Sequence, residues 1–118
     1  MLETLGSNVT LNTQALTTAG DITLGAVTGG GHTLNIETGI GVADTDVNGT
    51  SISNVTTLTL ANIGGTAAWT GAVTVGTLTA GSSVVNLSLT GDGNTVTNNF
   101  TPLNTGTLVL GVNTGAHT

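Results

Sequence analysis

Apolar residues recur along the chain in pairs separated by one position. Each pair lies in a short run rich in Thr and Val, and Gly, Asn or Asp separates the runs. Alternation with β-branched enrichment is typical of strands, and clusters of Gly and Asn indicate turns. The sequence therefore predicts an all-β protein with strands of about four to six residues. The pairs that carry the pattern are Val9 and Leu11, Ile22 and Leu24, Leu34 and Ile36, Leu58 and Leu60, Val73 and Val75, Leu87 and Leu89, and Leu108 and Leu110.

Two all-β architectures fit this pattern of short strands: an antiparallel β-sandwich, and a β-solenoid in which short strands stack in successive coils. Favoured two-residue hairpin turns occur only at Asn48-Gly49 and Asp92-Gly93, too few for an antiparallel meander. The large aromatics that fill a sandwich core are also missing. We therefore predict one β-solenoid domain or repeat segment over residues 1–118. At roughly 20 residues per coil it would have about six coils, and the antiparallel sandwich is the alternative.

Charge is almost absent, which excludes several functions. The chain has six Asp or Glu, no Lys or Arg and no Cys, so its net charge is −6. Nothing neutralises phosphates, and we expect no nucleic-acid binding. No apolar run approaches the roughly 20 residues that span a bilayer, so we expect no membrane insertion. The segment from Met1 to Gly20 lacks a basic start and an unbroken apolar stretch, and we expect no signal peptide within it.

Several segments resemble the repeats of secreted bacterial adhesins. Residues 19–24, AGDITL, are similar to a coil segment of filamentous-haemagglutinin-like adhesins. Residues 58–62, 71–79 and 104–111 resemble the repeats of bacterial β-strand-repeat surface proteins and autotransporter passengers. The resemblance implies a right-handed parallel β-helix at the surface of, or outside, a bacterial cell. Because the secretion and translocator domains of those proteins are missing here, the chain looks like a repeat segment or a small relative built from the same coil.

Residues 44–50, DTDVNGT, follow the opening of a calcium loop. Calcium takes about six to eight oxygen ligands, and Asp44, Asp46 and Asn48 stand at alternate positions before a glycine. The Glu expected at the end of an EF-hand loop is replaced by Val55. The alternative is a turn in which Asx side chains accept hydrogen bonds from backbone amides and Asn48-Gly49 reverses the chain. The sequence thus predicts either no cofactor or calcium at this loop.

The two aromatic residues are Trp69 and Phe100. Trp69 is either a platform on which sugars stack or a ring that fills the solenoid core. Carboxylates from different coils could align for polysaccharide hydrolysis. However, β-helix enzymes that cleave polysaccharides commonly use a cationic residue, and this chain has none. We expect that it is not an enzyme.

The leading functional hypothesis is an extracellular or cell-surface structural protein, either the shaft of an adhesin or a self-assembling surface filament. The second is an ice- or glycan-binding module, because residues 57–59 and 77–79 have the form Thr-x-Thr. Regularly spaced hydroxyls suit ordered water, but these segments do not recur at one constant period, which counts against this hypothesis. A polysaccharide-acting enzyme is the least favoured of the three.

The expected partners follow from the ends of the predicted stack. Neither end offers a helix former, a Lys or a Pro to cover open strand edges, and the single proline, Pro102, lies well before residue 118. Open edges at both ends predict head-to-tail self-association, or coverage by neighbouring repeats of a longer chain.

Overall fold

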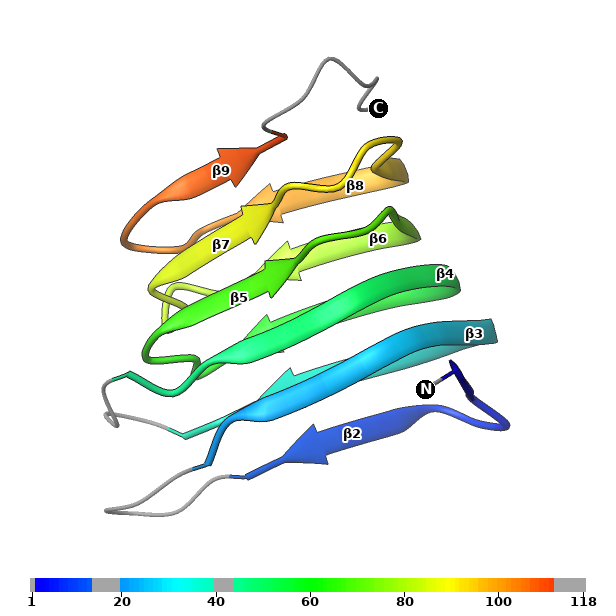
Figure 1. Cartoon of the computed structure of the whole chain (residues 1–118), viewed down its shortest axis with the longest axis horizontal. Coiled ribbons are helices and arrows are strands. Elements are labelled where there is room, and N and C mark those ends of the chain that lie inside the picture. Colours follow the sequence, from blue (N-terminus) through cyan, green and yellow to red (C-terminus); the bar gives the residue numbers. More distant parts are fainter. Residues whose placement is uncertain (1, 14–19, 40–43, 112–118) are drawn as a thin grey trace.

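The computed structural model describes residues 2–13, 20–39 and 44–111, and the regular elements in these ranges are nine β-strands. In these ranges no helix is long and apolar enough to cross a membrane. The strands are β1 (Leu2–Thr4), β2 (Val9–Asn12), β3 (Ile22–Glu37), β4 (Val47–Ala61), β5 (Thr66–Trp69), β6 (Val73–Ala80), β7 (Asn86–Leu89), β8 (Thr95–Pro102) and β9 (Leu108–Leu110) (Figure 1).

The chain winds into a right-handed β-solenoid. In Figure 1 the near strands run from left to right, the fainter distant strands return from right to left, and the chain climbs toward its C-terminus. Each pairing between described strands is parallel, which confirms the solenoid and excludes the antiparallel sandwich. The chain makes about four turns rather than six. The register shows four successive steps: Glu3 pairs with Val27, Val27 with Ile52, Ile52 with Val73, and the adjacent Thr74 with Thr95.

The coil count is lower than expected because the first coils are longer than the later ones. Asn8 and Thr33, which are joined by a hydrogen bond between the first two coils, stand 25 positions apart in the sequence. Asp46 and Thr66, which are joined in the same way in the middle of the chain, stand 20 positions apart. The expected count assumes that the shorter period holds throughout.

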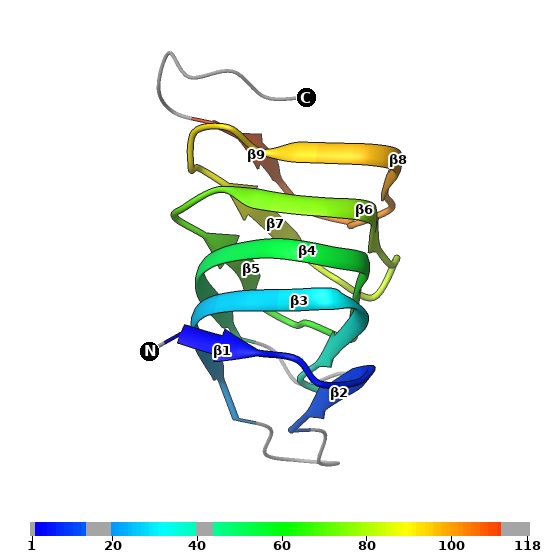
Figure 2. The same ribbon diagram turned by 90° about the vertical axis from the view of Figure 1, so that its right-hand side faces the viewer.

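Each coil passes three faces, which we name after a strand that lies wholly in each. Figure 2 shows the β1 face toward the viewer. Each face holds five stacked strand segments, so the described chain fills the three faces equally. The β5 face comprises residues 22–24 and 47–49 with β5, β7 and β9; the β1 face comprises β1 and residues 26–28, 51–53, 73–75 and 95–96; the β2 face comprises β2 and residues 33–37, 57–61, 77–80 and 99–102.

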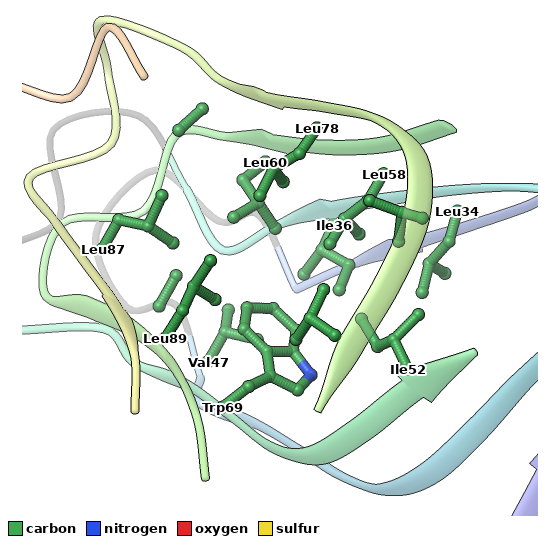
Figure 3. Packing of buried hydrophobic residues seen from close by; sticks show 14 of the residues in the cluster. Leu34, Ile36, Val47, Ile52, Leu58, Leu60, Trp69, Leu78, Leu87 and Leu89 are labelled. Atoms are coloured by element: carbon green, nitrogen blue, oxygen red, sulfur yellow. The ribbon is translucent and has the colours of Figure 1, made fainter. Parts of the chain in front are cut away.

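Inward side chains from the three faces form one aliphatic core, in which Figure 3 shows the labelled residues pointing toward one another. The seven apolar pairs predicted from the sequence all lie in strands, which confirms that part of the pattern. Equivalent residues of successive coils stack directly, as Leu34, Leu58 and Leu78 do, and these three side chains are at most 1% exposed. The core is therefore a set of aliphatic columns parallel to the solenoid axis.

Strands β3 and β4 are longer than predicted, at 16 and 15 residues. Pairing continues around the corners, and register shifts absorb the bend between the β1 and β2 faces. Tight packing at this corner requires residues that are small or that adopt the left-handed backbone conformation. A Cβ at position 76 would lie 2.5 Å from the carbonyl oxygen of Thr56, and Asn54 has a φ of 54°.

Candidate functional site

The three residues predicted as calcium ligands are spread over a corner and a strand. Asp44 is exposed at the corner with a φ of 61°, and Asp46 directly precedes β4. Asn48 lies within β4 and is exposed on the outside of the β5 face. The predicted chain reversal at Asn48-Gly49 is therefore wrong: this dipeptide continues strand β4, and Gly49 leaves room for the ring of Trp69 in the next coil.

Asp46 links two coils through the backbone. Its Oδ1 accepts a hydrogen bond of 2.8 Å from the N–H of Thr66 in the next coil. One coil below, Oδ1 of Asp21 accepts a bond of 2.9 Å from the N–H of Asp46. Further along this corner, Oδ1 of Asn86 accepts the N–H of Thr107 at 2.9 Å. These Asx side chains act as the amide acceptors of the alternative interpretation, but between coils rather than within one turn.

Sequence reasoning missed this column because its members are 20 to 25 positions apart. In the part of the chain that the structure describes, no group of three or more His, Cys, Asp or Glu side chains is placed to hold a metal ion. Calcium binding at Asp44, Asp46 and Asn48 remains a hypothesis.

Trp69 lies in the core and is 0% exposed. Its indole ring fills the space left by Gly49, its partner one coil below, where a Cβ would stand 2.7 Å from the ring atom Cε2. The indole Nε1 has no hydrogen-bond partner among the described atoms. A fully buried ring offers no surface on which a sugar can stack, so its position fits the core alternative.

The β2 face carries two columns of Thr and Asn on its outer side, which we call the Thr/Asn array. The register brings the Thr-x-Thr segments into line although their spacing along the sequence varies, because the corners absorb the difference. The uneven spacing therefore does not count against a regular surface. The first column is Asn8, Thr33, Thr57, Thr77 and Asn99, and the second is Thr10, Asn35, Thr59, Thr79 and Thr101.

The array is polar, uncharged and in register. Its ten positions hold seven Thr and three Asn, and their side chains are half-buried or exposed. Along a column they repeat at about 4.8 Å, and the two columns stand about 6.7 Å apart. Neighbours are linked where Nδ2 of Asn35 donates to Oγ1 of Thr10 at 3.4 Å, and where the N–H of Thr33 donates to Oδ1 of Asn8 at 3.0 Å.

The C-terminal end of the stack exposes core positions. Leu108 and Leu110 are 41% and 49% exposed, whereas Leu87 and Leu89, one coil below in the same columns, are 0% and 2% exposed. Among the described strands β9 pairs with β7 alone. The side chains of Leu108 and Leu110 therefore form the last layer of these core columns within the described residues.

Pro102 also lies on this edge, contrary to the prediction that neither end carries a proline. It is the last residue of β8, which pairs only with β6 among the described strands. The N–H of Leu103 donates down to the carbonyl oxygen of Ala80. Because successive residues of a strand direct their N–H groups to opposite neighbours, the Pro102 nitrogen faces the open edge. Distance from a chain terminus is a poor guide here, because a residue many positions before the last one can still lie in the final coil.

The N-terminal end has a hollow of about 560 Å³ below the β5 face. Apolar side chains that begin the core columns contribute to its wall, and polar residues of the neighbouring corner complete it. The lining residues are Leu11, Ile22, Leu24, Thr10, Asn12, Thr13 and Asp21.

Comparisons of the chain with protein-family models, with curated proteins and with solved structures found no match.

Proposed function

We propose that the chain is a structural β-solenoid, a unit of an extracellular shaft or surface filament that continues by stacking further coils on its ends, rather than an enzyme. The observation that carries the proposal is the match between the two ends. Each of the three faces holds five strand segments. The described path starts with β1 on the β1 face and ends with β9 on the β5 face, and the β1 face is the one that follows the β5 face in every coil. A second copy placed above continues the same right-handed path on every face.

The stacked copy would also continue the core columns. Its Ile22 would lie above Leu108, and its Leu24 above Leu110, because these residues begin and end the same columns of the β5 face. Ile22 and Leu24 in the lining of the N-terminal hollow thus occupy positions that correspond to the exposed Leu108 and Leu110 of the C-terminal edge. A contact between unlike ends is heterologous and propagates as a fibre.

The free energies expected for each face indicate which one contributes most to the contact. Covering the half-exposed side chains of Leu108 and Leu110 would contribute roughly 1 kcal/mol each, and β9 would gain the backbone hydrogen bonds of a new parallel partner. On the β2 face, Pro102 lacks one upward N–H, which removes one hydrogen bond of about 0.5–1.5 kcal/mol. The β5 face therefore supplies most of the stabilisation, and Pro102 weakens the β2 edge without closing the others.

The surface chemistry supports placement outside a cell in a structural role. The surface is rich in Thr and Asn, and the chain has no Lys or Arg. The resemblance to adhesin repeats points to a bacterial surface. In a longer chain, adjoining repeats would cover the same two ends that a second copy covers in a homopolymer.

Two lysine variants on one strand test the axial contact. Leu110→Lys places a charge at an inward position of the edge, where a stacked copy would bury it. Val109→Lys is the matched control, because Val109 is 37% exposed in the same strand but stands in the outward column of Thr23, Asn48, Ala68 and Ser88. Light scattering and electron microscopy at micromolar concentration measure assembly.

We expect the wild-type chain and Val109→Lys to form filaments with an axial repeat of about 4.8 Å, and Leu110→Lys to remain monomeric. Equal assembly of the two variants would contradict growth through this edge. A wild-type chain that stays monomeric at every concentration would contradict the homopolymer and leave coverage by adjoining repeats.

A further inference from the structure

The Thr/Asn array takes no part in the proposed axial contact, since its side chains point away from the core and not toward the ends of the stack. It is also a regular part of the surface. Every register shift of β3, β4, β6 and β8 lies outside residues 33–37, 57–61, 77–80 and 99–102, so the array is not interrupted by a bulge. A rigid parallel sheet therefore holds ten small polar side chains in a lattice.

We infer that this array binds ice. Each Thr presents a hydroxyl that can exchange hydrogen bonds with water and a methyl group that limits the ways in which the adjacent water can orient. Repetition at about 4.8 Å along the columns and about 6.7 Å across them imposes a two-dimensional order on that water. Order of this kind suits a crystalline water surface, and the backbone that positions it loses no further conformational entropy on binding.

The composition of the array favours ice over a polysaccharide. Sugar-binding surfaces generally include an aromatic ring against which the sugar packs, and none of the ten positions is aromatic. Phe100, in the same strand segment, packs against the core. The array also holds no charged group that would orient an acidic or basic glycan.

The other two faces do not offer an equivalent surface. On the β5 face the outward column of Thr23 and Asn48 continues through Ala68 and ends at Val109, so its polar groups are interrupted. On the β1 face Thr4, Thr28, Ser53, Thr74 and Thr95 form a single hydroxyl column. Ordering in two dimensions needs at least two adjacent columns, which the β2 face supplies.

The test compares bulky substitutions on and off the array. Thr57→Tyr and Thr79→Tyr each place a large ring within one column and hold a flat crystal away from the remaining side chains. Thr74→Tyr is the matched control, because Thr74 is exposed at an outward position of the β1 face. Far-UV circular dichroism verifies that all variants remain folded. Ice-recrystallisation inhibition and thermal hysteresis are the readouts, and the Leu110→Lys variant repeats them in a chain that does not assemble.

We expect the wild-type chain, Thr74→Tyr and Leu110→Lys to inhibit recrystallisation at similar concentrations. Thr57→Tyr and Thr79→Tyr should need more than about ten times as much protein, which corresponds to at least about 1.4 kcal/mol of lost binding. Absence of activity in the wild-type chain overturns the inference, as does equal loss in Thr74→Tyr. Binding to insoluble cellulose or chitin without any effect on ice would overturn it in favour of a glycan. A wild-type chain that inhibits recrystallisation but forms no filaments would contradict the homopolymer alone and leave the inference about ice intact.

Discussion

Gly49 and Trp69 give the sharpest test of how the core is packed. A methyl group at position 49 would collide with the indole ring of Trp69, at 2.7 Å from Cε2, and the fully buried ring has little room to move. Overpacking of this kind costs about 1–3 kcal/mol. At a glycine without such neighbours, the same change stabilises a protein by about 0.4–1 kcal/mol. Gly6 is the control, because nothing lies within 4 Å of a Cβ built there.

Urea unfolding followed by far-UV circular dichroism measures the difference, and the fluorescence of Trp69, the chain's single tryptophan, reports the core directly. With an m-value of about 2 kcal/mol per molar urea, Gly49→Ala should unfold about 1 M earlier than the wild-type chain, whereas Gly6→Ala should unfold at the same concentration or later. In a Trp69→Phe background the cost of Gly49→Ala should fall by about 1 kcal/mol or more, because the two sites are in contact. Equal urea midpoints for Gly49→Ala and Gly6→Ala would refute this account of the core. So would a destabilisation by Gly49→Ala that is as large in the Trp69→Phe background as in the wild-type chain.

Three other substitutions or additions test the links between coils. Asp46→Asn keeps an acceptor for the Thr66 amide and should leave the free energy of unfolding unchanged, whereas Asp46→Ala should lower it by about 1–3 kcal/mol; identical urea midpoints would show that this bond adds no stability. Asn94 is buried and accepts the N–H of Val73 at 2.9 Å, so Asn94→Ala should cost at least about 2 kcal/mol, while the exposed Asn98→Ala should change stability by less than about 0.5 kcal/mol. Because Asp46 already serves a backbone amide, millimolar Ca²⁺ should raise the melting temperature no more than Mg²⁺ does; a calcium-specific rise that a chelator reverses would support the calcium loop instead.

The sequence predicts the local structure of this chain better than its pairing. Alternation at Leu34 and Ile36, or at Leu87 and Leu89, identifies strands because each pair supplies two inward side chains to one face. The same alternation does not reveal how far along the sequence the partner of a strand lies, since corner length is free to vary from coil to coil. For that reason the pattern overestimates the number of coils.

Turn chemistry is misleading where a residue has a long-range role. Asn48-Gly49 has the composition of a tight turn, yet Gly49 lies in a strand because Trp69 of the next coil occupies the space of its side chain. Likewise Asp46 resembles a metal ligand within its own loop, whereas its Oδ1 serves an amide one coil away. The role of each residue depends on a neighbour in the following coil, and a local sequence pattern contains no information about that neighbour.

The candidate surfaces depend on the same register. The Thr-x-Thr segments at 57–59 and 77–79 look irregularly placed along the sequence, but pairing of Leu58 with Leu78 forces their outer side chains into common columns. A column tolerates any corner length as long as the inward residues on either side of the outward position remain aliphatic. Selection for a regular outer surface and selection for a continuous core therefore act on alternate residues of one strand, and each is free of the other. Two adjacent outward columns that stay polar and uncharged through five stacked strand segments, as in the Thr/Asn array, exceed what the core requires. That excess is the physical ground for assigning the β2 face a role of its own.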